Sequence, residues 1–187
     1  MNEYRLKKFE GSIYLCGFMA TGKSTIGRLI AKDLEKPFLD LDTVILSKEG
    51  CSIAEIFKKY GEEYFREKEW EALLELTRNY KGVVALGGGA LHNQQVVDHL
   101  KVHGLLIYIK TPLDVIVERV SRNTMRPIVL NNEGKIKSKE TLFKELKALY
   151  LSRDQLYEQA QIKMESSGLE SKDGQAQLLI EKIKRYV

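Results

Sequence analysis

Residues 17–25 have the spacing of a phosphate-binding loop, in which one glycine and four further residues precede Gly22, Lys23 and Ser24. The preceding residues 13–16 are apolar and strand-like, and apolar residues recur at helical spacing behind the loop. In such a unit the backbone N–H groups cradle a polyphosphate, the lysine reaches its terminal phosphates and the serine hydroxyl faces Mg²⁺. We therefore predict a nucleotide site here, with a plain glycine-rich turn as the alternative.

Two carboxylates, Asp40 and Asp42, close a short apolar segment at residues 38–42. Residues two apart in a strand point the same way, so both could address one site at the carboxyl end of the strand. The alternative is that Asp42 only caps the helix expected from Thr43.

Two arginines stand on helix faces that are otherwise apolar. Arg66 shares a face with Trp70 and Leu73, so it either stacks there or points into a cleft. Arg153 lies on the leucine stripe of the helix expected at residues 138–157. An arginine buried without a partner is too costly, and this one therefore requires a partner or an anionic ligand.

The glycines at 87–89 follow a strand expected at residues 83–86, and their lack of Cβ atoms would let backbone approach a ligand. A flexible turn is the alternative. Residues 123–137 are polar and are not expected to pack, which suggests a mobile lid. The arginines around its start could cover a transferring phosphoryl group or merely add surface charge; they are Arg119, Arg122 and Arg126.

Short strands alternate with helices along the chain, which predicts an α/β fold with a parallel sheet covered on both faces. A capping box of Ser52 and Glu55 starts one helix, and Gly61 interrupts it. Thr111 is expected to cap another helix, with Pro112 at its first position. The five strands are expected at residues 13–16, 38–42, 83–86, 105–109 and 161–164.

Composition narrows the class of protein. The 187 residues suit one domain, and no apolar run is long enough to cross a bilayer. The net charge of +4 comes without a basic block, so nucleic acid is not implied. The first ten residues resemble neither a secretory signal nor a transit peptide, so we expect a cytoplasmic protein. We also expect the protein to be a monomer. Cys16 and Cys51 are expected to be reduced thiols, and the three histidines show no metal or triad spacing.

An ordered set of segments resembles the shikimate kinase family, from about Ser12 to the C-terminal helix. The segments are GFMATGKST, FLDLD, SIAEIFKKYGEEYFREKE, ALGGGAL, RNTMRP and SRDQLY. The resemblance implies a P-loop kinase fold, with a five-stranded parallel sheet flanked by helices on both faces. It implies one domain over 1–187, with a substrate-binding segment at about 40–70 and a lid at about 120–137.

The resemblance also implies ATP and Mg²⁺ as cofactors, and phosphorylation of the 3-hydroxyl of shikimate in aromatic amino-acid biosynthesis. The implied nucleotide-binding residues are Gly17, Ala20, Thr21, Gly22, Lys23, Ser24, Thr25 and Arg126. The implied metal-binding residues are Ser24 and Asp40. The implied shikimate-binding residues are Asp42, Arg66, Gly88, Gly89 and Arg153. The implied catalytic residues are Asp42, Lys23 and Arg126.

The chain departs from the family pattern in places. Ala20 stands where the family often has glycine, which we expect to be tolerated because the loop pattern leaves that position free. The segment after Arg126 is longer than the family lid, and Arg119 and Arg122 compete for the role of stacking on adenine. Two rival hypotheses are a kinase of the same architecture for gluconate or a nucleoside monophosphate, and a relative that binds ligand without turnover.

Overall fold

The computed structural model describes residues 11–123, 127–131, 133–167 and 170–187. Five strands form one parallel sheet in the order β2-β3-β1-β4-β5. The strands are β1 (Ser12–Cys16), β2 (Phe38–Asp40), β3 (Val83–Ala85), β4 (Gly104–Lys110) and β5 (Ile162–Glu165). The α-helices are α2 (Lys23–Asp33), α3 (Leu41–Glu49), α4 (Ile53–Asn79), α5 (Gln94–His103), α6 (Leu113–Ser121), α7 (Lys139–Tyr157) and α8 (Lys172–Tyr186).

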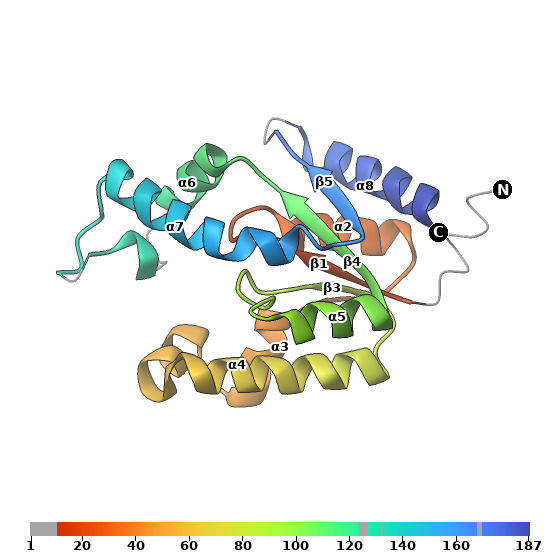
Figure 1. The fold of residues 1–187 in the computed structure, drawn as a ribbon, viewed down its shortest axis with the longest axis horizontal. Coiled ribbons are helices and arrows are strands. Elements are labelled where there is room, and N and C mark those ends of the chain that lie inside the picture. The colour runs from red at the N-terminus through yellow and green to blue at the C-terminus, as the bar shows by residue number, and fades with distance from the viewer. Residues whose placement is uncertain (1–10, 124–126, 132, 168–169) are drawn as a thin grey trace.

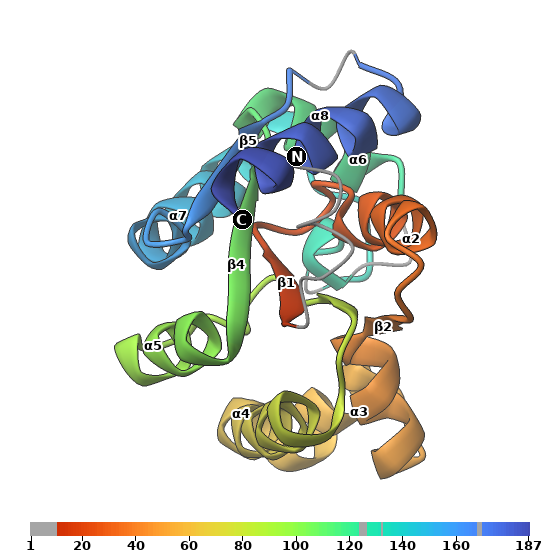
Figure 2. The ribbon, with the colours of Figure 1, turned by 90° about the vertical axis from the view of Figure 1, so that its right-hand side faces the viewer.

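Helices cover both faces of the sheet, as the alternation of strands and helices predicts (Figures 1 and 2). Ile13 and Leu15 of β1 pack with α2 and α8, whereas Tyr14 and Cys16 pack into a core that includes α4, α5 and α7. A parallel sheet buried on both faces needs apolar residues at successive positions, and all five residues of β1 are buried.

The prediction for residues 38–42 is wrong in part. The strand ends at Asp40, and α3 begins at Leu41 rather than at Thr43. Asp40, not Asp42, is the capping residue, because its Oδ1 accepts a hydrogen bond from the Asp42 backbone N at 3.1 Å. Asp42 therefore points from the first turn of a helix and not from a strand.

Of two helix caps predicted from the sequence, one is confirmed and one is wrong. The capping box of Ser52 and Glu55 is confirmed, and Gly61 with φ of 85° kinks the long helix α4. The hydroxyl cap expected from Thr111 is wrong, because Pro112 occupies the N-cap position of α6 without a side-chain bond. The Thr111 hydroxyl is buried and has no hydrogen-bond partner within the described part of the chain.

The segment after α6 packs more than its polar sequence predicts. A single 3₁₀ turn, η1 (Pro127–Val129), is followed by an antiparallel bridge between Leu130 and Ile136. Val129 is fully buried, and its carbonyl accepts a hydrogen bond from the Lys137 N at 2.8 Å. Val129 therefore anchors the described residues of the expected lid to the core.

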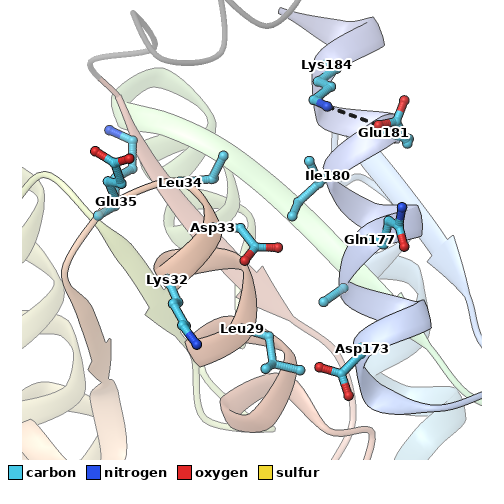
Figure 3. Close-up of a pocket in the computed structure, with 12 residues that line it drawn as sticks. Leu29, Lys32, Asp33, Leu34, Glu35, Asp173, Gln177, Ile180, Glu181 and Lys184 are labelled. Carbon is cyan, nitrogen blue, oxygen red and sulfur yellow. Dashed lines mark hydrogen bonds and ion pairs between the residues drawn. The ribbon is translucent and has the colours of Figure 1, made fainter.

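A groove with a volume of about 760 Å³ lies between α2 and α8 (Figure 3). Leu29, Leu34 and Ile180 contribute its apolar part, and charged residues of both signs surround them. The groove is lined by the C-terminal half of α2 and the residues that follow it, and by α8 from Asp173 to Lys184. No helix among the described residues is long and apolar enough to cross a membrane.

Candidate active site

The loop between β1 and α2 has the backbone that its glycine spacing predicts. Gly17 has φ of 135°, and a Cβ there would lie 2.5 Å from the Ile109 carbonyl oxygen, so a side chain would not fit. Gly22 has φ of 98° and is the N-cap of α2. The Lys23 residue is only 8% exposed, and its ammonium donates hydrogen bonds to the Gly17 and Phe18 carbonyls at 2.9 and 2.8 Å. Its charge is thus held inside the loop, where phosphates are expected to bind.

Ala20 adopts a left-handed conformation with φ of 60°. A residue with a Cβ pays about 1–2 kcal/mol in that region, whereas glycine does not. Alanine at this position is therefore strained, and the strain gives a physical reason for the glycine that the family often has there.

Ser24 and Asp40 come together across the gap between α2 and β2. The Ser24 hydroxyl donates to Asp40 Oδ2 at 2.5 Å, and the other carboxylate oxygen caps α3. Mg²⁺ is usually held by one or two protein oxygens, with water and substrate phosphates completing its octahedron. One hydroxyl and one carboxylate beside a phosphate loop fit that chemistry.

A cleft of about 240 Å³ joins the loop to the residues expected around the acceptor. Asp42, Lys23 and Ser24 all line it. A Cβ on Gly87 would lie 2.7 Å from Asp42 Oδ1, so the missing side chain makes room for this carboxylate. The full lining is Met19, Ala20, Gly22, Lys23, Ser24, Thr25, Asp40, Asp42, Leu86, Gly87 and Gly88.

The other two glycines of the triplet make room for different neighbours. A Cβ on Gly88 would meet the Met19 backbone N at 3.1 Å, and one on Gly89 would meet the Arg66 guanidinium at 2.5 Å. The triplet is thus a close-packed junction between the phosphate loop and α4, and not the flexible turn that was the alternative.

Arg66 combines features of both alternatives for its helix face, because its guanidinium lies 5.2 Å from the centre of the Phe65 ring and also lies against Gly89. Its Nη1 donates to Glu69 Oε2 at 2.6 Å and its Nη2 to Glu62 Oε1 at 3.0 Å. Trp70 instead packs edge-on against His99. Sequence reasoning missed Glu69, which lies three residues after Arg66 on the same face; that spacing was the available signal.

Glu69 is a buried carboxylate between the two sides of the acceptor site, with an exposed fraction of 1%. Burial raises its pKa and the nearby Asp42 charge raises it further, whereas Arg66 and Arg153 lower it. The pocket therefore holds a negative charge at an energetic cost, and that charge orients Arg66.

Arg153 reaches the same junction from α7. Its Nη1 donates to the Gly88 carbonyl at 3.0 Å, and its guanidinium carbon lies 5.9 Å from the centre of the Phe18 ring. The Tyr157 hydroxyl donates to the same carbonyl, a contact that sequence reasoning missed. Arg66 and Arg153 thus approach the glycine triplet from two helices, which suits recognition of a small anionic group.

The arginines after β4 separate into distinct positions. Arg119 donates to the Ala20 carbonyl at 3.1 Å and so contacts the phosphate loop. Arg122 instead pairs with Glu118 on the surface, with 74% of its side chain exposed. This geometry favours Arg119 over Arg122 as the residue beside the nucleotide. Arg126, expected to be the lid arginine, lies outside the described residues.

These features define a class of protein: a P-loop phosphotransferase with a phosphate loop, a magnesium position and an adjoining pocket for a small anionic acceptor. The family model described as shikimate kinase matches residues 19–184. The chain belongs to the shikimate kinase family.

Individual relatives agree with this assignment. A shikimate kinase of Aquifex aeolicus is 38% identical over 142 residues, covering 76% of this chain and 83% of the relative. One of Psychrobacter cryohalolentis is 42% identical over 147 residues, covering 78% of this chain and 74% of the relative. The solved shikimate kinase of Acinetobacter baumannii in complex with shikimate superposes with a TM-score of 0.82 at 34% identity, covering 97% of this chain and 98% of that one.

Proposed function

We propose that this chain transfers the γ-phosphoryl group of ATP to the 3-hydroxyl of shikimate through the residues that meet in the 240 Å³ cleft. The observation that carries the proposal is this shared lining, in which the phosphate loop, Asp40 and Asp42 surround one cavity. Arg66 and Arg153 stand beside it at the glycine triplet.

The donor side binds and orients the phosphates of ATP. The loop N–H groups and the α2 N-terminus attract the phosphate chain, and Lys23 neutralises its terminal part. Ser24 and Asp40 would hold Mg²⁺, which supplies positive charge to the oxygens of the transferring group when bound. Phosphoryl transfer depends on positioning and charge stabilisation, and these residues provide both.

The acceptor side orients the hydroxyl that attacks. Asp42 is half-buried and lines the same cleft as Lys23, so it can accept the hydroxyl proton as the oxygen approaches the phosphorus. Arg66 and Arg153 bind the shikimate carboxylate, for which two guanidinium groups are well matched. The glycine triplet brings the Gly88 backbone close to the ring.

A rival kinase, one that acts on gluconate, shares the fold at a much lower sequence identity than the shikimate kinases do. A gluconokinase of Sinorhizobium meliloti superposes with a TM-score of 0.52 at 16% identity, which speaks for the fold alone. We further propose the cytoplasm as the place of work, because ATP is available there and Cys16 and Cys51 are both free thiols.

A panel of acceptors tests the function. Purified protein with ATP and Mg²⁺ is expected to release ADP with shikimate, and not with gluconate or nucleoside monophosphates. Release with another acceptor but not with shikimate would refute the proposal.

Asp42→Asn tests the chemical role within the same assay. Because general base catalysis contributes about 10²–10⁴-fold, kcat is expected to fall at least a hundredfold while ADP binding stays close to that of the unchanged protein. Full activity of the variant would remove Asp42 from the reaction.

A further inference from the structure

Lys172, the first residue of α8, reaches the phosphate loop at Gly22. Its Nζ lies 3.0 Å from the position that a Cβ on Gly22 would occupy, and its Cε lies 3.7 Å from that position. Gly22 is the N-cap of α2, so the ammonium stands at the helix end where phosphates are expected to bind. The loop spacing does not reveal this residue, which follows Gly22 by 150 positions.

Positive charge from two helix ends and from Arg119 lies near Lys172, although Glu170 and Asp173 are also close in the chain. The N-terminal ends of α2 and α8 each carry partial positive charge, which makes a lysine in the first turn unfavourable. Arg119, which donates to the Ala20 carbonyl of the loop, adds a full charge nearby. Burial and the Arg119 charge lower the pKa of Lys172, and Glu170 partly opposes them.

Within the described part of the chain, the Lys172 ammonium donates one long hydrogen bond to a neutral group, the Gln175 Oε1 at 3.3 Å. Glu170, the nearby carboxylate, is engaged by the Ser167 backbone N and by the Gln175 amide at 3.3 and 3.4 Å. Lys172 is a half-buried cation beside a phosphate loop, and its one long bond to a neutral group compensates its charge weakly, so an anionic ligand would offset its repulsion from Arg119.

We propose that Lys172 binds the phosphate chain of the adenine nucleotide, acting with Arg119 on the donor side of the loop. This inference rests on the proposed function, because it takes the loop to be the nucleotide site. It adds a cation from the last helix to a donor site otherwise built from the first helix, the loop and α6.

The test compares three variants by isothermal titration with ADP and with adenosine. Lys172→Met removes the charge, Lys172→Arg keeps it, and Lys182→Met removes a charge from an exposed position further along α8. Because Lys172→Met removes one charge-assisted contact to a phosphate, it is expected to weaken ADP binding about tenfold. Lys172→Arg is expected to retain most of the affinity, and Lys182→Met all of it.

Adenosine separates a phosphate contact from a contact to the base. Its affinity is expected to be the same in all variants, because it carries no phosphate. Unchanged ADP binding by Lys172→Met would overturn the proposal, as would an equal loss for ADP and adenosine. These titrations contain no shikimate, so failure of the acceptor panel would refute the proposed function without affecting them.

A measurement on the unchanged protein covers the case in which the methionine variant fails to fold. Modification by an amine-reactive reagent, read by mass spectrometry, is expected to slow at Lys172 when ADP is added and to stay constant at Lys182. Equal modification of Lys172 with and without ADP would overturn the proposal.

Discussion

Replacing Glu69 by glutamine should weaken shikimate binding without weakening the fold. Arg66 is shared between Glu69 at 2.6 Å and Glu62 at 3.0 Å, and the Glu69 side chain is 1% exposed whereas that of Glu62 is 64% exposed. The buried partner holds the guanidinium against Gly89. Without that charge, Glu62 is expected to draw Arg66 outward, away from the acceptor.

The size of the effect follows from the bond that changes. A charge-assisted hydrogen bond contributes about 1.5–3 kcal/mol and a neutral one about 0.5–1.5 kcal/mol, and glutamine keeps the neutral form. The difference of about 1–1.5 kcal/mol corresponds to a five- to tenfold rise in the Kd and KM for shikimate. The KM for ATP is expected to stay unchanged, because Glu69 does not line the loop side of the cleft.

The melting temperature distinguishes a positioning role of Glu69 from a merely structural one. Loss of a structural role would lower the Tm. The pKa of Glu69 is raised in the folded protein, chiefly by burial, so removing its charge relieves a desolvation cost that offsets the weaker bond to Arg66. The Tm of Glu69→Gln should therefore be equal to or above that of the unchanged protein.

Glu62→Gln is the matched control, since it removes the exposed partner of the same arginine. An exposed pair of this kind contributes about 0–1 kcal/mol, so little change in shikimate binding is expected. A Glu69→Gln variant with unchanged affinity for shikimate, or with a clearly lower Tm, would refute the positioning role.

Three further predictions address the loop, the acceptor pocket and pH. Ala20→Gly relieves the left-handed strain, and after the entropy cost of glycine it should raise the free energy of unfolding by up to about 1 kcal/mol, seen as a Tm about 2–4 °C higher; a lower Tm would contradict this. Arg153→Ala should raise the KM for shikimate about tenfold with little change for ATP, and an unchanged KM would return Arg153 to a structural role. Burial, His103 and Arg78 lower the pKa of His99, so the unfolded chain takes up a proton that the fold resists, and stability should fall as pH drops through about 6.5. His99→Gln should reduce that loss in thermal melts between pH 7.5 and 5.5.

The sequence by itself determined the features that depend on neighbouring residues. The loop at 17–25 needs glycines where φ is positive, a lysine and a serine at fixed offsets, and these are visible without a fold. The capping box of Ser52 and Glu55 is similarly local. The alternation of apolar strands with helices predicted the parallel sheet with helices on both faces, because each layer must bury its apolar side.

The sequence predicted local structure less reliably where one segment fits more than one type of secondary structure. Asp40 and Asp42 could extend the strand or start the helix, and the hydrogen bond from the Asp42 N to Asp40 decided for the helix. Val129 shows the same limit, since the apolar run of residues 128–130 is too short to give a period that would predict which of its residues is buried.

Only the tertiary structure decided which distant residues share a site. Arg119 and Arg122 are equivalent as sequence, yet their directions from α6 bring one to the phosphate loop and leave the other on the surface. In the sequence, Glu69 is one of many charged residues in a charged helix. Its role arises only because α4 packs against the glycine triplet and buries the Glu69 side chain. Lys172 meets Gly22 only because α2 and α8 pack together and begin at the same edge of the sheet. Burial and proximity between elements set these roles, and neither is encoded in the spacing of neighbouring residues.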